Sequence, residues 1–208
     1  MNPDWSALTR AITGAVTLPT SAGYDGARLA FNTRTHDVRP AAIVHCAGED
    51  DVVAALAFAD RFGMPRAVRS GGHCFAGRST SPGLVIDVSP MHAVEVTGDI
   101  ATIGAGARLG DVSTRLEAHG ITIPGGTCPT VGIAGLVLGG GLGILGRRHG
   151  TTSDRLVAAR VVLAGGDVVE CDEQHHADLL WALRGGGAGT LGVVTAFRFA
   201  TVPAPEVV

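Results

Sequence analysis

Glycine is concentrated in three short clusters of this chain, and these clusters constrain the fold more than any other feature. Glycine accounts for 31 of the 208 residues, about twice the usual share. The clusters lie at 70–73, 125–143 and 184–189, each next to an apolar run. Glycine is needed where φ is positive or where backbone approaches a ligand closely, and consecutive N–H groups in such loops bind anions. Three such loops indicate a large ligand that carries a pyrophosphate.

The common nucleotide-binding motifs do not explain these clusters. The pattern Gly-x-Gly-x-x-Gly occurs twice, at 141–146 and 187–192. The dinucleotide fingerprint also needs a preceding strand, a following helix and an acidic residue about 20 positions later, and neither match has this context. A P-loop needs lysine, and the chain has none. The prediction of a nucleotide ligand therefore stands without either motif.

Length, charge and hydropathy exclude several classes of protein. A chain of 208 residues, of which 46% are hydrophobic, can bury a core without disulfides or metals as one domain or two small lobes. Sixteen basic against nineteen acidic residues leave no positive excess for nucleic acid. The longest uncharged apolar stretch, 131–146, is shorter than the about 20 residues that cross a bilayer. The N-terminus also lacks the pattern of a secretory signal, so we expect neither a nucleic-acid nor a membrane partner.

The cysteines and the acidic and histidine residues show no metal-binding pattern. Four cysteines lie far apart in the chain: Cys46, Cys74, Cys128 and Cys171. Without a Cys-x-x-Cys pair or zinc-ligand spacing, they predict reduced thiols in a cytoplasmic protein. Residues 172–176 combine acidic and histidine side chains, but adjacent positions on an extended chain point apart. We therefore expect a solvated loop there and no metal site.

Strands and helices are predicted without strict alternation. Residues 1–38 are polar and irregular after a short helix at 5–12. An apolar strand at 41–46, an amphipathic helix ending at Gly63 and a strand at 67–69 then form a strand–helix–strand unit, predicted to be parallel. The remaining predicted elements are a meander of strands at 84–87, 93–96 and 101–103, a helix at 109–116, a hairpin of 156–163 with 168–171, a helix at 177–183 and a strand at 191–199. This mixture favours an α+β fold over a doubly wound sheet.

Two nucleophilic side chains lie within the glycine clusters. His73 ends the turn 70–73, and Cys128 follows Gly125-Gly126-Thr127. Taken alone, each has a plain structural explanation: a histidine after Gly-Gly is most often a turn residue, and a cysteine in an apolar loop is usually a small buried hydrophobe. The motifs that surround His73 and Cys128 give a more specific interpretation when they are considered together.

The motifs between Tyr24 and Pro203 keep the order and spacing of one known family. They are Tyr24-Asp25-x-Ala27-Arg28, Phe31-Asn32, Arg39-Pro40-Ala41-Ala42-Ile43, Val68-Arg69-Ser70-Gly71-Gly72-His73, Gly126-x-Cys128-Pro129-Thr130-Val131-Gly132, Leu138-Gly139-Gly140-Gly141-x-Gly143 and Arg184-Gly185-Gly186-Gly187. This set resembles the FAD-binding PCMH-type domain of the vanillyl-alcohol-oxidase superfamily, and within it the berberine-bridge-enzyme-like oxidases. The resemblance implies a two-lobed α+β domain over 39–205, with lobes of about 39–95 and 96–205, after a lead-in at 1–38.

The resemblance also implies FAD as the cofactor and two covalent attachment residues. In the family, the histidine that matches His73 bonds to the flavin 8α-methyl group, and in one branch the cysteine that matches Cys128 bonds to C6. A neutral imidazole and a thiolate are suitable nucleophiles for this electron-poor ring. The cofactor-binding residues implied are Arg69, Ser70, Gly71, Gly72, His73, Cys74, Gly77, Thr127, Cys128, Val131, Gly132, Gly135, Leu138, Gly139, Gly140, Gly141, Gly143, Gly189, Gly192, Val193 and Val194.

Several departures from the family pattern bear on activity. Residues 188–192 read Ala-Gly-Thr-Leu-Gly where the family commonly has Gly-Gly-Asn-Phe-Gly, Leu136 stands where plant members often have histidine, and Arg155 replaces the usual asparagine. Family members also continue into a substrate-binding domain that typically supplies the catalytic base, and we expect this domain to be absent from the chain. We therefore name no catalytic residue in this chain.

Three hypotheses about function follow. The leading one is an FAD-dependent oxidoreductase domain that takes a hydride from an alcohol, sugar or amine C–H bond of a small molecule and passes the electrons to oxygen or another acceptor. The second is a flavin-binding module without catalysis of its own, or a fragment that needs a partner chain for its substrate site. The third is a glycine-rich scaffold that binds no cofactor.

Overall fold

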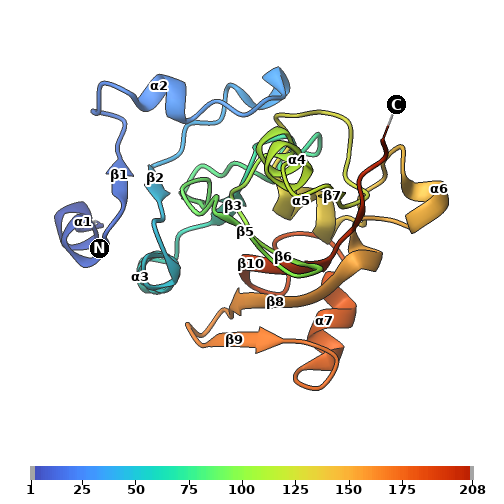
Figure 1. The fold of residues 1–208 in the computed structure, drawn as a ribbon. Coiled ribbons are helices and arrows are strands. Elements are labelled where there is room, and N and C mark those ends of the chain that lie inside the picture. The colour runs from blue at the N-terminus through green and yellow to red at the C-terminus, as the bar shows by residue number, and fades with distance from the viewer. Residues whose placement is uncertain (1–2, 207–208) are drawn as a thin grey trace.

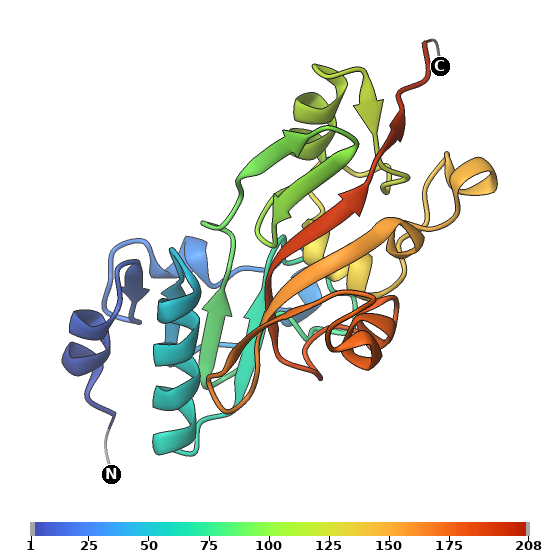
Figure 2. The same ribbon diagram turned by 60° about the horizontal axis from the view of Figure 1, so that its bottom comes forward.

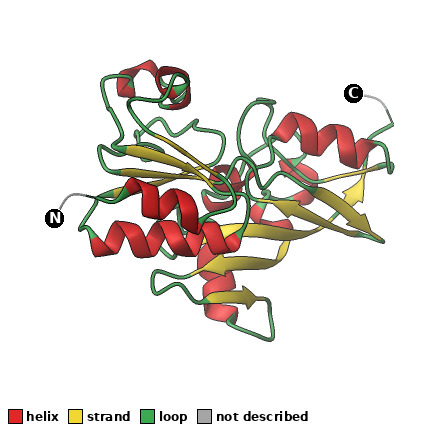
Figure 3. Cartoon of the chain, turned by 90° about the vertical axis from the view of Figure 1, so that its left-hand side faces the viewer, coloured by secondary structure: helices red, strands yellow, loops and turns green. Residues whose placement is uncertain are grey.

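The structure is a computed structural model that describes residues 3–206. Two larger β-sheets lie side by side, with helices packed against each of them (Figure 1), and a third sheet has only two strands. Figure 3 shows the two sheets on opposite sides of the molecule, with loops crossing between them.

The first sheet has the strand order β1-β2-β4-β3. Its strands are β1 (Ala15–Thr17), β2 (Ala42–His45), β3 (Arg66–Arg69) and β4 (Leu84–Asp87). Both β2 and β3 run parallel to β4, which confirms the predicted parallel strand–helix–strand unit and inserts one strand into it. The prediction that 84–87 belongs to a meander is wrong, because this run is buried along its whole length and pairs on both edges, as a central parallel strand does.

Helix α3 (Glu49–Arg61) connects β2 to β3 and packs along the first sheet (Figure 2). Acidic residues fill its first turn, where they interact favourably with the helix dipole. One of them, Asp51, is only 2% exposed, and its carboxylate accepts hydrogen bonds from the backbone N–H groups of Thr13, Gly14 and Ala47. The buried carboxylate therefore ties the N-terminal segment to the start of α3.

The N-terminal segment, expected to be irregular after its first helix, has regular structure in several places. It contains α1 (Trp5–Ala11), β1, α2 (Tyr24–Ala27) and the 3₁₀ helix η1 (Thr33–Thr35). Helix α1 packs beside α3, where the Trp5 and Phe58 rings lie 5.2 Å apart. Strand β1 pairs antiparallel with β2 and so extends the first sheet. The sequence pattern did not reveal this strand, because it is an edge strand of only three residues and is only partly buried.

The second sheet is antiparallel, with the order β5-β6-β10-β8-β9. Its strands are β5 (Val94–Thr97), β6 (Ile100–Gly104), β8 (Leu156–Val162), β9 (Val168–Cys171) and β10 (Val193–Ala200). The predicted hairpin of β8 with β9 is confirmed. The last predicted strand lies at the centre of this sheet, which explains its long apolar run. The other elements are α4 (Leu109–Glu117), β7 (Ile121–Thr122), α5 (Ile133–Leu138), α6 (Gly146–His149), η2 (Ser153–Arg155), α7 (Ala177–Leu183) and β11 (Val202–Pro203).

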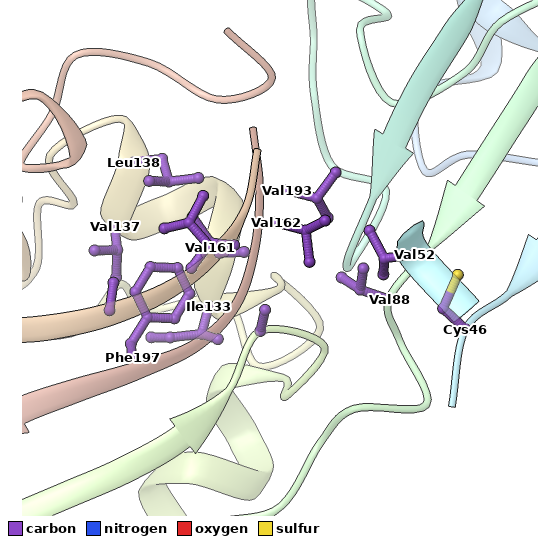
Figure 4. Packing of buried hydrophobic residues seen from close by; sticks show 14 of the residues in the cluster. Cys46, Val52, Val88, Ile133, Val137, Leu138, Val161, Val162, Val193 and Phe197 are labelled. Carbon is purple, nitrogen blue, oxygen red and sulfur yellow. The ribbon is translucent and has the colours of Figure 1, made fainter. Parts of the chain in front are cut away.

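One hydrophobic core runs through both sheets. Figure 4 shows Val52 of α3 and Val88 facing Val162 and Val193 of the second sheet, while α5 packs against Phe197. Fully burying one such side chain contributes about 1.5–3 kcal/mol. The two sheets therefore share one core, and this shared core fixes the positions of the loops between them.

Candidate cofactor site

The loops that carry the two predicted attachment residues touch at a pair of glycines. A Cβ on Gly71 would lie 2.2 Å from the backbone nitrogen of Gly132, and a Cβ on Gly132 would lie 2.3 Å from the backbone nitrogen of Gly71. Side chains do not fit at these positions because interiors are close-packed and backbone atoms cannot yield by so much. We call residues 70–73 and 128–132 the attachment loops. Glycine allows these two loops to meet backbone to backbone.

This contact brings His73 and Cys128 to the same hydroxyl group. Thr130 Oγ1 lies 3.0 Å from His73 Nε2 and 3.5 Å from Cys128 Sγ. The two groups come from loops that are more than fifty residues apart in sequence, yet a single threonine hydroxyl contacts both. An imidazole and a thiol that share one hydroxyl can approach two positions on the same ring system.

The surroundings of both side chains favour the forms that act as nucleophiles. Burial, and then the positive charge of Arg108, lower the pKa of His73, which favours the neutral imidazole. The Thr130 hydroxyl, and then its backbone N–H, lower the pKa of Cys128, which favours the thiolate. In contrast, burial raises the pKa of Cys171 in the core. The attachment loops therefore suit nucleophilic chemistry.

An aromatic ring covers one face of the His73 imidazole. Phe31 stacks on it with ring centroids 4.1 Å apart and ring planes inclined by 15°. The backbone N–H of Phe31 donates a hydrogen bond of 3.1 Å to the carbonyl oxygen of Gly72. Because Phe31 is 59% exposed, its stacking orients the imidazole more than it stabilises the fold.

The Arg69 side chain links the backbone segments on either side of the Phe31–His73 stack. It is a buried residue at the end of β3, and its guanidinium donates hydrogen bonds to the carbonyl oxygens of Ala27, Arg28 and Ser79. These bonds join the segment before Phe31 to the strand before the first attachment loop. Arg69 was predicted to bind the cofactor, and the structure places its guanidinium among backbone carbonyls instead of in the cavity wall.

A cavity of about 680 Å³ opens beside the attachment loops. Its volume lies within the range of ligand pockets in proteins. Its wall comes from the first attachment loop, helix α5 and the segment that leads into β10. The predicted cofactor-binding residues in this wall are Ser70, Gly71, Gly72, His73, Cys74, Cys128, Val131, Gly132, Gly135, Leu138, Gly189, Gly192, Val193 and Val194.

The cavity wall offers unused backbone donors and open space at glycines. The consecutive N–H groups of residues 71–74 donate no hydrogen bond to any other residue between 3 and 206, and such a series binds anionic oxygens. Gly72 within it has a φ of +72°. A Cβ at Gly135 or Gly189 would meet no atom within 4 Å. Donors for a pyrophosphate and room for a ring system are therefore both present, and these residues fit FAD.

Several residues predicted to bind the cofactor lie outside this wall. They are Arg69, Gly77, Thr127, Gly139, Gly140, Gly141 and Gly143. Two of these glycines are explained by contacts within the protein: a Cβ on Gly141 would lie 2.4 Å from the Thr152 hydroxyl, and a Cβ on Gly143 would lie 1.7 Å from the carbonyl oxygen of Gly125. Thr127 lines a second, smaller cavity of about 260 Å³.

The cavity wall also contains residues that the sequence prediction of the site did not include. The most informative are Phe31, Phe75, Arg78 and Leu136. Phe75 is 78% exposed, which is unusual for a large apolar ring, and it follows the first attachment loop by two positions. Proximity to the glycine cluster could have suggested Phe75 and Arg78, but nothing in the sequence places Phe31 on the ring of His73.

The other polar clusters have structural roles. Asp87 accepts hydrogen bonds from His45 Nδ1 at 3.0 Å and from the backbone N–H of Ser89 at the end of β4. Residues 172–176 form an exposed turn in which His175 contacts Asp172. Within residues 3–206, no group of three or more histidine, cysteine or acidic residues is arranged to hold a metal ion. No helix in that part of the chain is long and apolar enough to cross a membrane.

Comparison with known proteins identifies a family match. Residues 40–172 match the family described as FAD binding domain. The curated (R)-6-hydroxynicotine oxidase of Paenarthrobacter nicotinovorans is 36% identical over 187 residues, which cover 88% of this chain and 40% of that protein. Residues 40–172, which match the family, contain both attachment loops.

Solved structures agree with this match. The Physcomitrella patens BBE-like 1 structure superposes with a TM-score of 0.91 and 35% identity, covering 96% of this chain and 44% of that one. Glucooligosaccharide oxidase from Acremonium strictum, described with a 6-S-cysteinyl, 8α-N1-histidyl FAD, superposes with a TM-score of 0.89 and 36% identity, covering 99% of this chain and 44% of that one. The chain thus spans less than half the length of these relatives.

Proposed function

Because the chain belongs to the FAD-binding domain family of berberine-bridge-enzyme-like, FAD-linked oxidoreductases, we propose that it holds FAD through covalent bonds from both His73 and Cys128. The observation that carries this proposal is the single Thr130 hydroxyl within hydrogen-bonding reach of both side chains. The adjoining cavity of about 680 Å³ supports it.

The proposed bonds require an oxidant. Each link breaks one flavin C–H bond and one protein N–H or S–H bond, and counted from the neutral imidazole and thiol it releases two protons and two electrons; a Cys128 thiolate has already released one of these protons. We propose dioxygen as the acceptor of these electrons. In this proposal His73 supplies a nitrogen lone pair and Cys128 a thiolate, which agrees with the lowered pKa of each.

The remaining cavity residues have distinct proposed roles. The free N–H groups of residues 71–74 would bind the pyrophosphate. Arg78 forms no ion pair with another residue in the described part of the chain, so its guanidinium would add positive charge. Gly135 and Gly189 would leave room for the rings. Leu138 and Val193 would contact them as apolar surface.

The reaction that we propose is oxidation of a small molecule. Bound FAD would accept a hydride from an alcohol, sugar or amine C–H bond and pass the electrons to dioxygen or another acceptor. Relatives named as a glucooligosaccharide oxidase and a hydroxynicotine oxidase support sugar and amine donors as substrate classes. The protein's part in this step is to fix the ring at two points beside the cavity.

A second candidate is a flavin-binding module whose base comes from elsewhere. Among the described residues that line the cavity, none is aspartate or glutamate, the groups that commonly act as general bases together with histidine. The one histidine in the wall is already assigned to attachment. Under this alternative, a partner chain or further sequence would supply the base and the substrate contacts.

Acid precipitation of the purified chain tests the attachment. A yellow pellet, with two crosslinked sites in peptide mass spectrometry, is the expected result for wild type. His73→Ala and Cys128→Ala should each keep one link, and the double variant should release all its flavin into the supernatant. A colourless wild-type pellet would contradict the proposal. Turnover of a sugar, alcohol or amine panel by the chain alone would exclude the flavin-binding module.

A further inference from the structure

The hydroxyl of Thr130 is shared between two groups with different hydrogen-bonding needs. Its oxygen lies 3.0 Å from His73 Nε2 and 3.5 Å from Cys128 Sγ. A hydroxyl has one hydrogen to donate and lone pairs to accept with. It can therefore donate to one of these neighbours while it accepts from the other, and this choice sets the protonation of both.

The backbone around Thr130 fixes where this hydroxyl lies. Val131 N–H donates to the Cys128 carbonyl oxygen at 3.3 Å, which closes a turn through the attachment loop. Gly110 N–H donates to the carbonyl oxygen of Pro129 at 2.9 Å and anchors the turn to α4. The Thr130 carbonyl oxygen lies beside Gly71, 3.0 Å from where a Cβ on that residue would stand. The Thr130 side chain therefore extends from a backbone whose position is fixed by these contacts.

Hydrogen-bond strength decides which neighbour receives the hydroxyl hydrogen. A bond to an ionised acceptor is roughly twice as strong as a bond between neutral groups, so the Thr130 hydrogen goes to the Cys128 thiolate. The Thr130 oxygen then accepts from the N–H at His73 Nε2. This assignment leaves the lone pair of the imidazole on Nδ1, which makes no hydrogen bond to any other residue in the described chain.

We propose that Thr130 is the positioning residue for both attachments: it holds Cys128 as a thiolate and holds His73 in the tautomer whose free nitrogen is Nδ1. This inference rests on the proposed function, because it specifies how the two attachment residues are prepared before FAD arrives. It adds a residue that the sequence analysis did not assign to the cofactor.

Two substitutions separate the hydroxyl from the bulk of the side chain. Thr130→Val removes the hydroxyl and keeps the β-branched shape, whereas Thr130→Ser keeps the hydroxyl. Thr114→Val is the matched control, because Thr114 lies on α4, is exposed, and bonds only to the carbonyl oxygen of Gly110 in its own helix. All three are made in the full chain, and circular dichroism checks that each one folds.

The first measurement is alkylation of Cys128 in flavin-free protein. Iodoacetamide is added across a pH series, and the Cys128 peptide is quantified by mass spectrometry, which separates it from the other three cysteines. The Thr130→Val chain should react about fivefold more slowly at neutral pH, with its midpoint moved to higher pH. Thr130→Ser and Thr114→Val should remain within about twofold of wild type. Arg108 and His73, the nearby titratable groups, are unchanged in all of these variants.

The second measurement is the tautomer of His73. Nitrogen-15 chemical shifts of histidine-labelled protein report it, and a His73→Gln spectrum assigns the signal. Wild type should show the proton on Nε2, and Thr130→Val should show a mixture of tautomers. Neither this measurement nor the alkylation needs flavin, so both test Thr130 whether or not FAD attaches to wild type.

The third measurement is attachment itself, by peptide mass spectrometry after reconstitution with FAD. Loss of the Cys128 link and slowed formation of the His73 link in Thr130→Val, with rescue in Thr130→Ser, would support the proposal. If Thr130→Val matches wild type in alkylation and in tautomer, the proposal is wrong even where both links form. If wild type carries no covalent flavin but the two flavin-free measurements respond as expected, the attachment function fails while the role of Thr130 in setting these protonation states stands.

Discussion

The attachment loops and the glycine segment at 139–143 have similar compositions and different structural consequences. In the attachment loops, glycines let two backbones touch, so that the side chains beside them converge, and the N–H groups of residues 71–74 have no acceptor within the described part of the chain. In the 139–143 segment, glycines pack against Thr152 and the carbonyl oxygen of Gly125, outside the cavity wall. A glycine-rich run therefore does not by itself mark a ligand site, because some of its glycines are required by neighbouring protein atoms and others, such as Gly135 and Gly189, border open space at the cavity.

The largest effect is expected from a methyl group placed between the attachment loops. Gly132→Ala would force its Cβ against the backbone of Gly71 and should lower the free energy of unfolding by about 2–4 kcal/mol. Acid-stable flavin should fall at least about tenfold, because a loop shift of even 1 Å separates His73 from Cys128. Urea unfolding and the absorbance of the acid pellet measure the two effects.

Gly135→Ala is the variant to compare with Gly132→Ala, because it adds the same methyl group at a position without crowding. Its Cβ points into open space at the cavity, so the fold should keep its stability or gain up to about 1 kcal/mol from helix propensity, while flavin incorporation falls.

A Gly132→Ala protein that carries as much covalent flavin as wild type would mean that the contact between the loops is not what aligns the two attachment residues.

A smaller and different effect is expected in the 139–143 segment. Gly141 has a φ of +79°, and a Cβ there would crowd the Thr152 hydroxyl. Gly141→Ala should therefore cost about 1–3 kcal/mol of stability. The folded fraction should retain wild-type amounts of covalent flavin, as measured by pellet absorbance normalised to folded protein. Normal stability combined with loss of flavin would instead assign this segment to the cofactor, as the sequence first suggested.

The stacked ring beside His73 should affect attachment more than stability. Phe31→Ala removes the ring that covers the imidazole, and the rate of flavin attachment should fall several-fold while stability changes by less than about 1 kcal/mol. A time course of attachment to flavin-free protein measures this rate. Trp181→Ala, which removes an exposed aromatic ring on α7, serves as the control and should leave the rate unchanged.

The smallest effect is expected at Asp154, near the 139–143 segment. Its carboxylate accepts hydrogen bonds from the backbone N–H and the hydroxyl of Thr151, and these bonds lower its pKa. A lowered pKa stabilises the fold at pH values above the usual aspartate range, and this contribution disappears as pH falls through the lowered value. Asp154→Asn should lower the melting temperature at pH 7 by less than about 3 °C.

The difference between wild type and Asp154→Asn should shrink below about pH 4, and covalent flavin should be unaffected. Melting curves at pH 7 and pH 3 test the sign of this dependence. A difference that grows on acidification would show that the Thr151 contacts do not govern the ionisation of this carboxylate.

The elements that the sequence predicted well are those with a strong local pattern. The helix at 177–183 and the hairpin of β8 with β9 were both found, because apolar spacing and a Gly-Gly-Asp turn are local signals. Strand β4 was assigned to the wrong neighbours, since a run that is apolar on both faces does not reveal which strands flank it. Strand β1 was missed because an edge strand of three residues carries almost no pattern.

Motif order along the chain was enough to show the resemblance to the family, and that resemblance implied FAD as the cofactor and His73 and Cys128 as candidate attachment residues. Three features required the folded chain: the Thr130 hydroxyl within reach of both groups, the Phe31 ring on the imidazole, and the Arg69 guanidinium among carbonyls instead of in the cavity. Each depends on at least one contact between segments distant in sequence. Local pattern cannot encode such contacts, because they are set by how two sheets pack around one shared core.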